Sequence, residues 1–146
     1  MRKLVVLLIG LSAMLATVLR ADNDKVIQLN QLPAAAQQFI QQHFSGSKVL
    51  LVKMDKDIIS RSYEVIFEGG SKIDFDSNGA WEEIDCRASA VPEAAVPSKI
   101  ADYVKANYPD ASIRKIEKDT REYEVKLSNR VELSFDLKFK LIDIDI

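Results

Sequence analysis

The sequence is poor in the residues on which disulfide-bonded proteins and most enzymes depend. It has one cysteine, Cys86, and one histidine, His43. A single cysteine cannot form a disulfide within the chain, and a metal site or a catalytic base at His43 would have no second imidazole as companion. The G-x-S-x-G, H-E-x-x-H, P-loop and dinucleotide-binding motifs are also absent. We therefore expect a protein that is not an enzyme and that needs no cofactor.

Clustered positive charge is also missing. The chain has 20 basic and 22 acidic residues, and the basic residues are scattered, with no strip of interleaved aromatic residues. Nucleic-acid binding requires clustered Lys and Arg. We therefore expect no nucleic-acid partner, and a mildly acidic chain leaves an envelope or secreted protein as the kind of partner to consider.

The longest apolar stretch lies at the start of the sequence. Arg2 and Lys3 precede an apolar run over residues 4–19, and Ala21 is a small residue at the end of the segment. This order is typical of a cleavable secretory signal, and the run is shorter than the about 20 residues of a membrane-spanning helix. The sequence predicts export to the periplasm or beyond, with cleavage after Ala21 and no transmembrane segment in the mature form.

The rest of the chain contains the same pattern twice. Leu32-Pro33 opens the first copy and Val96-Pro97 opens the second, an offset of 64 residues. From Tyr63 and Tyr123 onward the offset is 60, because the second copy is four residues shorter before that point. Such a duplication indicates two similar structural units. We predict a polar lead-in over residues 22–31 and a single domain over 32–146, made of repeats 32–86 and 96–146 with a linker over 87–95.

Each repeat is predicted to contain one helix followed by four strands. Apolar residues spaced by three and four follow each proline, and this spacing is typical of an amphipathic helix. They are Ala36, Phe39, Ile40 and Phe44 in the first copy, and Ile100, Tyr103, Val104 and Tyr108 in the second. The strands are expected over residues 49–54, 62–68, 71–76 and 80–86, and over 113–118, 122–128, 130–136 and 138–145. Gly69-Gly70, Asn78-Gly79 and Ser128-Asn129 are hairpin signals between them.

Alternation along the strands assigns their faces. Tyr63, Val65 and Phe67 share one face while Glu64 and Glu68 point the other way, and their counterparts from Tyr123 onward alternate in the same manner. One buried and one solvated face is typical of an antiparallel sheet, and the two helices are the available cover for the apolar face. The predicted fold class is α+β: two tandem α-β4 repeats whose sheets join or abut, with both helices on one face. Ile113 and Ile116 fall on opposite faces of an ideal strand, which indicates a bulge or an edge position.

The repeated residues resemble those of a known family. Leu32-Pro33, Phe75-Asp76 and Trp81 in the first copy, and Tyr123-Glu124-Val125 with Phe135-Asp136 in the second, fit a pattern similar to that of the PepSY-like family of secreted bacterial proteins. The resemblance covers residues 30–146 and implies a β-lactamase-inhibitor-protein-like fold, an exported domain, and inhibition or ligand binding by analogy. The second copy departs from the pattern at Leu137-Lys138-Phe139, where the first has Ser77-Asn78-Gly79.

One segment has the spacing of a calcium loop. Asp74, Asp76, Asn78 and Asp85, with Gly79 in the sharp turn, match D-x-D-x-N-G followed by a later acid. Its flanks alternate like strands rather than helices, and the segment also makes a good β-turn. Binding of Ca²⁺ or a small ligand by this acidic turn is therefore the alternative hypothesis. The carboxylates of the two last strands are interpreted as solubilising charge at sheet edges, and Cys86 as a small apolar residue at a strand end.

Four apolar residues are predicted to lie on the solvated face. If Ile84, Ile142 and Ile144 share the buried face, then Trp81, Phe139 and Leu141 point the other way, and Ile66 joins them. Aromatic and aliphatic anchors beside acidic residues are typical of protein interfaces. We interpret these four as candidates for partner binding through the exposed sheet face. Cover by the chain's own linker or lead-in, or by a second subunit, is the competing interpretation.

Overall fold

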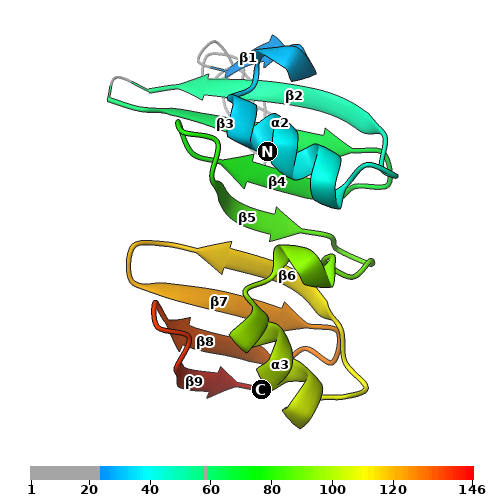
Figure 1. Ribbon diagram of the computed structural model, residues 1–146, viewed down its shortest axis with the longest axis vertical. Coiled ribbons are helices and arrows are strands. Elements are labelled where there is room, and N and C mark those ends of the chain that lie inside the picture. Colours follow the sequence, from blue (N-terminus) through cyan, green and yellow to red (C-terminus); the bar gives the residue numbers. More distant parts are fainter. Residues whose placement is uncertain (1–23, 58) are drawn as a thin grey trace, which may run out of the picture.

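A computed structural model describes residues 24–57 and 59–146. Its strands form a single antiparallel sheet of nine strands in the sequential order β1-β2-β3-β4-β5-β6-β7-β8-β9. Both α-helices, α2 and α3, cover the same side of this sheet (Figure 1), and within residues 24–57 and 59–146 no helix covers the other side, which is called the open face below. The sheets of the two repeats join directly, because β5 of the first pairs with β6 of the second. The predicted α+β architecture is confirmed.

The elements follow one another without long gaps. Their bounds are β1 Asp24–Ile27, η1 Leu29–Gln31, α2 Ala34–His43, β2 Val49–Lys56, β3 Arg61–Phe67, β4 Lys72–Phe75, β5 Trp81–Asp85, η2 Glu93–Ala95, α3 Ser98–Asn107, β6 Ile113–Lys118, β7 Glu122–Leu127, β8 Glu132–Asp136 and β9 Leu141–Asp145. Both helices and all eight predicted strands are present, and Pro33 and Pro97 each precede their helix by one residue. No helix in the described ranges is long and apolar enough to span a membrane.

The polar lead-in predicted over residues 22–31 contains regular structure in the part that is described. Residues 24–27 form β1, which pairs with β2 and places Ile27 opposite Val52. The 3-10 helix η1 follows, as η2 follows β5 in the second half. A four-residue strand with two charged residues has too little alternation to be recognised alone, and the partner strand decides its conformation. The predicted export signal over residues 1–21 lies outside the described residues.

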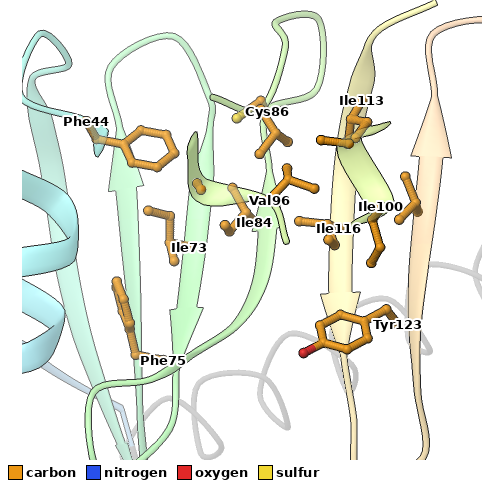
Figure 2. Close-up of a cluster of buried hydrophobic side chains, with 14 of the residues drawn as sticks. Phe44, Ile73, Phe75, Ile84, Cys86, Val96, Ile100, Ile113, Ile116 and Tyr123 are labelled. Carbon is orange, nitrogen blue, oxygen red and sulfur yellow. The ribbon is translucent and has the colours of Figure 1, made fainter. Parts of the chain in front are cut away.

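The core is built on a row of aliphatic residues that crosses the sheet. Cross-strand partners place one branched aliphatic residue of every strand in this row: Ile27, Val52, Val65, Ile73, Ile84, Ile116, Val125, Leu133 and Ile144. Ile84 and Ile116 continue the row across the junction of the repeats, beside Val96 and Ile100 (Figure 2). Ile84 and Ile116 are both fully buried. The two repeats therefore share one hydrophobic core.

The helices pack on this core through equivalent aromatic pairs. Phe39 of α2 lies edge-on to Phe75 at 5.9 Å between ring centroids. Tyr103 of α3 lies edge-on to Phe135 at 5.5 Å, and these positions correspond between the repeats. Edge-to-face packing at this distance is favourable for aromatic rings. The amphipathic faces predicted for the two helices are thus the ones that cover the sheet.

Bulges explain where the simple alternation of faces fails. The register of β6 against β7 shifts between Ile113 and Lys115, so that Ile113 and Ile116 are both buried, which confirms the bulge expected there. Two further bulges, at equivalent places in β5 and β9, were not predicted. In β5, Trp81 lies opposite Phe75 and Glu83 opposite Asp74, so that Glu82 is an extra residue. An extra residue of this kind moves the preceding side chain to the other face.

Candidate functional site: the open face of the sheet

Two rows of polar residues cross the side of the sheet that the helices leave open. The first row runs from β2 to β9 through Leu51, Ile66, Lys72, Asp85, Lys115, Lys126, Glu132 and Asp145. The second runs through Lys53, Glu64, Asp74, Glu83, Glu117, Glu124, Ser134 and Asp143. The second row contains six carboxylates and one lysine, whereas the first has three lysines at its centre. Lysines of one row therefore lie beside carboxylates of the other.

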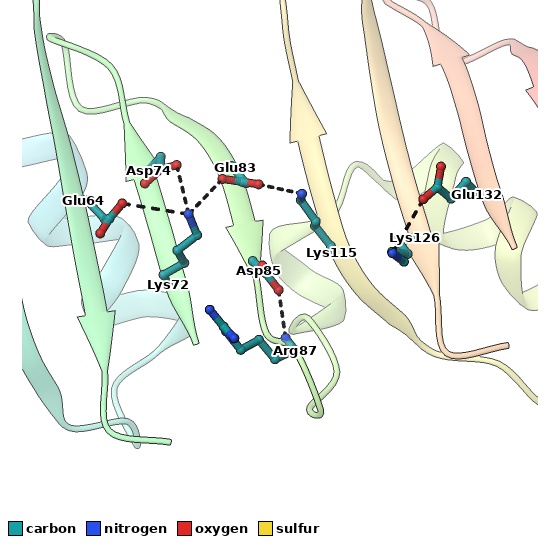
Figure 3. Close-up of polar contacts among 9 residues, drawn as sticks. All are labelled: Glu64, Lys72, Asp74, Glu83, Asp85, Arg87, Lys115, Lys126 and Glu132. Carbon is teal, nitrogen blue, oxygen red and sulfur yellow. Dashed lines mark hydrogen bonds and ion pairs between the residues drawn. The ribbon is translucent and has the colours of Figure 1, made fainter. Parts of the chain in front are cut away.

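Lys72 and Glu83 are at the centre of this network (Figure 3). The Lys72 Nζ atom lies 3.5 Å from Glu83 Oε2, and 3.9 Å from a carboxylate oxygen of both Glu64 and Asp74. The other oxygen of Glu83, Oε1, lies 2.9 Å from Nζ of Lys115 in the second repeat. Glu83 therefore joins the two repeats on the open face, as Ile84 joins them in the core.

The pair Asp74 and Glu83 favours a proton on one of its two carboxyl groups, because their pKa values are shifted in opposite directions. Burial, together with the hydrogen bond to Glu83, raises the pKa of Asp74 from its ordinary value of 3.8 to about 7. Burial also acts to raise the pKa of Glu83, but hydrogen bonds with Asp74 and Lys115 lower it overall. The proton belongs on Asp74, because Glu83 has two lysines nearby and Asp74 has one. Protonated Asp74 then donates its O–H to the Glu83 carboxylate.

Two hollows of opposite charge lie on this face. Asp24, Asp55, Glu64, Asp74 and Glu82 line a hollow of about 290 Å³ over the first strands, with Lys53 among them. Arg87, Arg114, Lys115, Lys126 and Arg130 line a second hollow of about 510 Å³ over β5 to β7, with Asp85 as its only carboxylate. A ligand seated across the sheet would therefore meet negative charge at one end and positive charge at the other.

The two repeats have the same core and different open faces. Buried equivalents are alike, as in Val65 and Val125 or in Ile73 and Leu133. On the open face four pairs of equivalents differ in charge: Lys53 corresponds to Glu117, Lys72 to Glu132, Leu51 to Lys115, and Ile66 to Lys126. Three other pairs stay acidic, namely Glu64 and Glu124, Glu83 and Asp143, and Asp85 and Asp145. Folding requires the buried positions to stay apolar, whereas positions on the open face can change their charge without loss of the core. The two halves of the open face thus present different chemistry.

The predicted calcium ligands do not come together. Asp76 Oδ1 accepts hydrogen bonds from the backbone N–H groups of Asn78 at 2.9 Å and of Ala80 at 3.0 Å, so it stabilises the turn between β4 and β5. Asp74 belongs to the Lys72 network, and Asp85 Oδ1 accepts the N–H of Arg87 at 3.0 Å. Within residues 24–57 and 59–146, no three His, Cys, Asp or Glu side chains are placed to hold a metal. The acidic residues match the spacing of a calcium loop because they lie in a β-hairpin, in which alternate residues point to the same face.

Three of the four predicted partner-binding residues lie on the other side of the sheet. Ile66 is on the open face, as expected, opposite Lys72. Trp81 and Phe139 approach the buried ring of Tyr123, at 6.4 and 5.3 Å between ring centroids, and Leu141 lies opposite core residue Phe135. The bulges in β5 and β9 cause this difference, so the assignment of Trp81, Phe139 and Leu141 to the open face is wrong.

Trp81 remains partly accessible on the helix side. With Phe39, Tyr123 and Pro97 it lines a hollow of about 370 Å³ between the two helices. Cys86 is buried, and burial raises the pKa of its thiol. A raised pKa disfavours the reactive thiolate, in agreement with the interpretation of Cys86 as an apolar residue. His43 is at the end of α2, with its ring 4.7 Å from that of Phe39.

Sequence reasoning missed the importance of Lys72 and Lys115. Both were visible as charged residues in alternating strands, but neither belonged to a motif. Their common partner Glu83 lies between them only because β5 pairs with β6. The sequence left open whether the two sheets join or abut, and therefore gave no signal for this contact.

The fold defines the class of this protein. It is a duplicated α+β unit with both helices on one face of the sheet and an open, charged face on the other. Residues 61–143 match the family described as "Putative beta-lactamase-inhibitor-like, PepSY-like". The chain belongs to this family. A comparison with curated proteins finds no match.

Three crystal structures from Bacteroides are similar to this chain. A "putative calcium-regulated periplasmic protein" from Bacteroides thetaiotaomicron is 60% identical, with a TM-score of 0.83, and the similarity covers 86% of this chain and 99% of that one. A "putative periplasmic protein" of the DUF2874 family from Bacteroides vulgatus is 54% identical, with a TM-score of 0.83 and the same coverage. A third, of unknown function and from the same species, is 38% identical, with a TM-score of 0.77, and covers 84% of this chain and 99% of its own.

Proposed function

We propose that this protein is an exported, non-enzymatic binding or inhibitory module, and that its partner protein docks on the open face of the sheet. Similar proteins are described as periplasmic, which supports export by the signal over residues 1–21, with cleavage after Ala21. The observation that carries the proposal is the divergence of the open face between two repeats whose cores are equivalent. Charge that folding does not require is available for recognition.

The arrangement of charges supports a macromolecular partner. The acidic hollow at Asp74 and the basic hollow at Arg130 lie over different strands of one sheet, so a partner that covers both must extend across several strands. The Glu83 bridge between Lys72 and Lys115 fixes the middle of this surface before binding. Preorganised charges of both signs favour selection among partners.

A non-enzymatic role is supported by the surroundings of the carboxylates. Acid–base catalysis by two carboxylates requires a cleft in which they keep different protonation states beside a substrate. Asp74 and Glu83 do differ in protonation, but they lie on an open sheet face with Lys72 among them. Their arrangement serves charge pairing between strands.

Charge reversal in the basic hollow tests the proposal. Lys126→Glu with Arg130→Glu should abolish capture of a periplasmic partner and weaken its binding by at least tenfold once that partner is purified, because attraction becomes repulsion. The matched control is Lys99→Glu with Lys105→Glu, two reversals on the exposed side of α3. Melting temperatures of both variants should stay close to that of the parent protein, since surface ion pairs contribute little to stability.

The two variants give opposite expectations, which makes the proposal refutable. It is wrong if the open-face variant still captures the same protein with unchanged affinity. It is also wrong if both variants lose binding equally, because binding would then follow net charge and not the open face. Raising the ionic strength should weaken the genuine complex, since its exposed charge contacts are screened.

Calcium binding is a second candidate function. The description of the Bacteroides thetaiotaomicron protein as calcium-regulated favours it, and the acidic hollow favours a cation over the first strands. The ligands of the predicted turn, Asp74, Asp76, Asn78 and Asp85, are separated, and no other three acidic side chains of the described residues are placed to hold a metal. A site in the hollow, formed by Asp24, Asp55 and Glu64, therefore requires a rearrangement when Ca²⁺ binds. These side chains would have to converge, because Ca²⁺ takes six to eight oxygen ligands.

Calorimetric titration decides this second candidate. Ca²⁺ should release or absorb heat with the parent protein and raise its melting temperature, whereas Asp55→Asn with Glu64→Gln should remove both effects. Asp143→Asn with Asp145→Asn removes two carboxylates of β9 and is the matched control. No heat and no thermal shift at millimolar Ca²⁺ would eliminate calcium binding.

A further inference from the structure

The outer edge of β9 is an unfilled copy of the junction between the repeats. β9 is equivalent to β5, with an offset of 60 residues, so that Asp143, Ile144 and Asp145 correspond to Glu83, Ile84 and Asp85. β5 has neighbours on both sides, β4 and β6, whereas β9 pairs only with β8 in the described part of the chain. Figure 1 shows β9 as the last strand of the sheet.

Exposure of the aliphatic row changes at this edge. Ile84 has 0% exposure, because Ile116 of β6 lies opposite it and Val96 and Ile100 lie beside it (Figure 2). Its equivalent Ile144 has 43% exposure. The row of branched aliphatic residues is therefore continuous over eight strands and ends with an accessible member at the ninth.

We propose that the outer edge of β9 binds an extended segment of a partner protein, which adds to the sheet as an antiparallel tenth strand. The segment places a branched aliphatic side chain opposite Ile144 and a basic side chain opposite Asp145. Main-chain hydrogen bonds to an exposed edge supply affinity in this mode of recognition, and alternate side chains supply specificity. The site is separate from the open-face hollows.

The chemistry of this segment follows from the internal precedent. In the β5·β6 pair, Ile116 lies opposite Ile84 and Lys115 opposite Asp85. Lys115 also reaches diagonally to Glu83, with Nζ 2.9 Å from Oε1. On β9, Asp145 corresponds to Asp85 and Asp143 corresponds to Glu83. A basic residue of the added strand would therefore lie opposite Asp145 and diagonal to Asp143, and would meet two carboxylates.

A second copy of the chain fits this edge less well. Pairing β9 with β9 of another molecule in antiparallel fashion would bring the acidic Asp143 and Asp145 of both molecules together, and like charges opposite one another are destabilising. The opposite edge of the sheet is also less suited, because β1 has only four residues and includes Lys25. Short edge strands with lysine are typical protection against strand addition.

A synthetic peptide with the sequence of residues 111–119 is the probe, since it carries Ile116 and Lys115 in the required order. It should shift backbone amide resonances of residues 141–145 and of the adjacent β8, and leave those of β1 unchanged. Lys115→Glu in the peptide, or Asp145→Lys in the protein, should each weaken binding about five- to tenfold by replacing an attractive cross-strand pair with a repulsive one. The combination of the two reversals should restore part of the affinity, because the directly opposite pair is again of opposite charge while Asp143 on the diagonal stays acidic.

Restoration by the double reversal is the decisive result, because a merely damaged fold could not produce it. Ile144→Ser should weaken binding as well, and Lys25→Glu at the other edge is the matched control that should leave it unchanged. The proposal is overturned if the peptide does not bind at millimolar concentration, if the shifts lie around the two open-face hollows instead of at β8 and β9, or if the reversals do not compensate. Sedimentation that shows a dimer of the protein alone, dissociated by Ile144→Ser, would identify a second copy as the occupant and would also overturn it.

Discussion

At the scale of single residues, the raised pKa of Asp74 beside Glu83 favours a proton on Asp74 at the centre of the open face. A half-buried carboxyl next to another carboxylate is easier to protonate than a free one. Lys72 opposes this effect on Asp74 but does not cancel it, since the pKa of Asp74 is still raised to about 7. A lysine that serves three carboxylates is not enough to keep all of them charged.

This proton makes stability depend on pH. The folded-state pKa of Asp74, about 7, is above its ordinary value of 3.8, so between these values the folded protein holds a proton that the unfolded chain has released. Stability from this group is complete below the lower value and is lost as pH rises toward 7. Asp74→Asn should therefore lose less stability than the parent protein between pH 4 and 7, as measured by urea denaturation.

A second variant separates this effect from a general change of charge. Glu83→Gln removes the carboxylate that accepts a hydrogen bond from protonated Asp74. The dependence of stability on pH over the same interval should therefore become smaller. Glu83 itself acts in the other direction, because its lowered pKa gives stability that is lost as pH falls below about 4.5. Parallel curves for the parent protein and Asp74→Asn from pH 4 to 8 would contradict the assignment.

At the scale of elements, the last hairpin of each repeat shows that one turn geometry can be reached with different residues. Asp76 and Asp136 each accept two backbone N–H groups of their turn. The left-handed position is Gly79 in the first repeat, with φ 86°, and Phe139 in the second, with φ 69°. A left-handed φ is costly for a bulky residue, and packing of the Phe139 ring near Tyr123 at 5.3 Å offsets part of this cost.

The two turns also differ in what lies next to them. A Cβ atom on Gly79 would come within 2.8 Å of the Ala36 backbone nitrogen and 2.9 Å of the Pro33 Cβ atom. The start of α2 therefore packs directly on the first turn, which requires glycine for space as well as for its φ angle. In the second repeat the equivalent position holds Phe139, whose ring lies 5.3 Å from that of Tyr123 in β7. Equivalent turns thus perform different packing tasks.

At the scale of the whole molecule, the junction between β5 and β6 makes the two repeats one folding unit. The aliphatic row passes through Ile84 and Ile116 without interruption. On the open face, Glu83 connects Lys72 of one repeat to Lys115 of the other. Because both faces of the sheet are joined at this place, neither repeat has a complete core by itself.

Two equivalent substitutions measure this coupling. Ile84→Ala should cost about 2–5 kcal/mol of unfolding free energy, because it leaves a cavity in a fully buried row. Ile144→Ala at the equivalent but half-exposed position should cost about 1 kcal/mol, because water already reaches that side chain. Urea denaturation followed by fluorescence of Trp81 and by far-UV circular dichroism should give one coincident transition for both variants. Equal costs, or two separate transitions, would show that the repeats are independent.

Features of this structure that depend on neighbours in the sequence could be predicted, whereas features that depend on contacts between distant segments could not. Helix faces and most strand faces followed from local spacing, as Phe39 in α2 and Val65 in β3 show. The bulge at Ile113 was detectable because two isoleucines had incompatible positions in an ideal strand. The bulge before Glu83 had no such signal, since Trp81 is compatible with either face, and β1 was missed because only its partner strand makes it extended.

The candidate site was less predictable than the fold, because charges on an open face carry no local pattern that identifies their partners. Asp74 and Asp85 are close in sequence and suggested one cation site, yet they belong to different rows of the sheet. Lys115 is remote in sequence and contacts Glu83 directly. Cross-strand neighbours are decided by register, and register at the junction depends on the pairing of two strands that are separated by a helix.

The sequence alone determined that the chain is duplicated, that each copy is a helix followed by four strands, and that the apolar side of the sheet lies under the helices. These follow from periodicity and from the need to remove apolar side chains from water. Only the tertiary structure decided that the two sheets join at β5 and β6, that bulges turn Trp81 and Leu141 toward the core, and that Lys72, Glu83 and Lys115 meet on the open face. Such contacts arise from strand register, which is a property of the assembled sheet and not of any single strand.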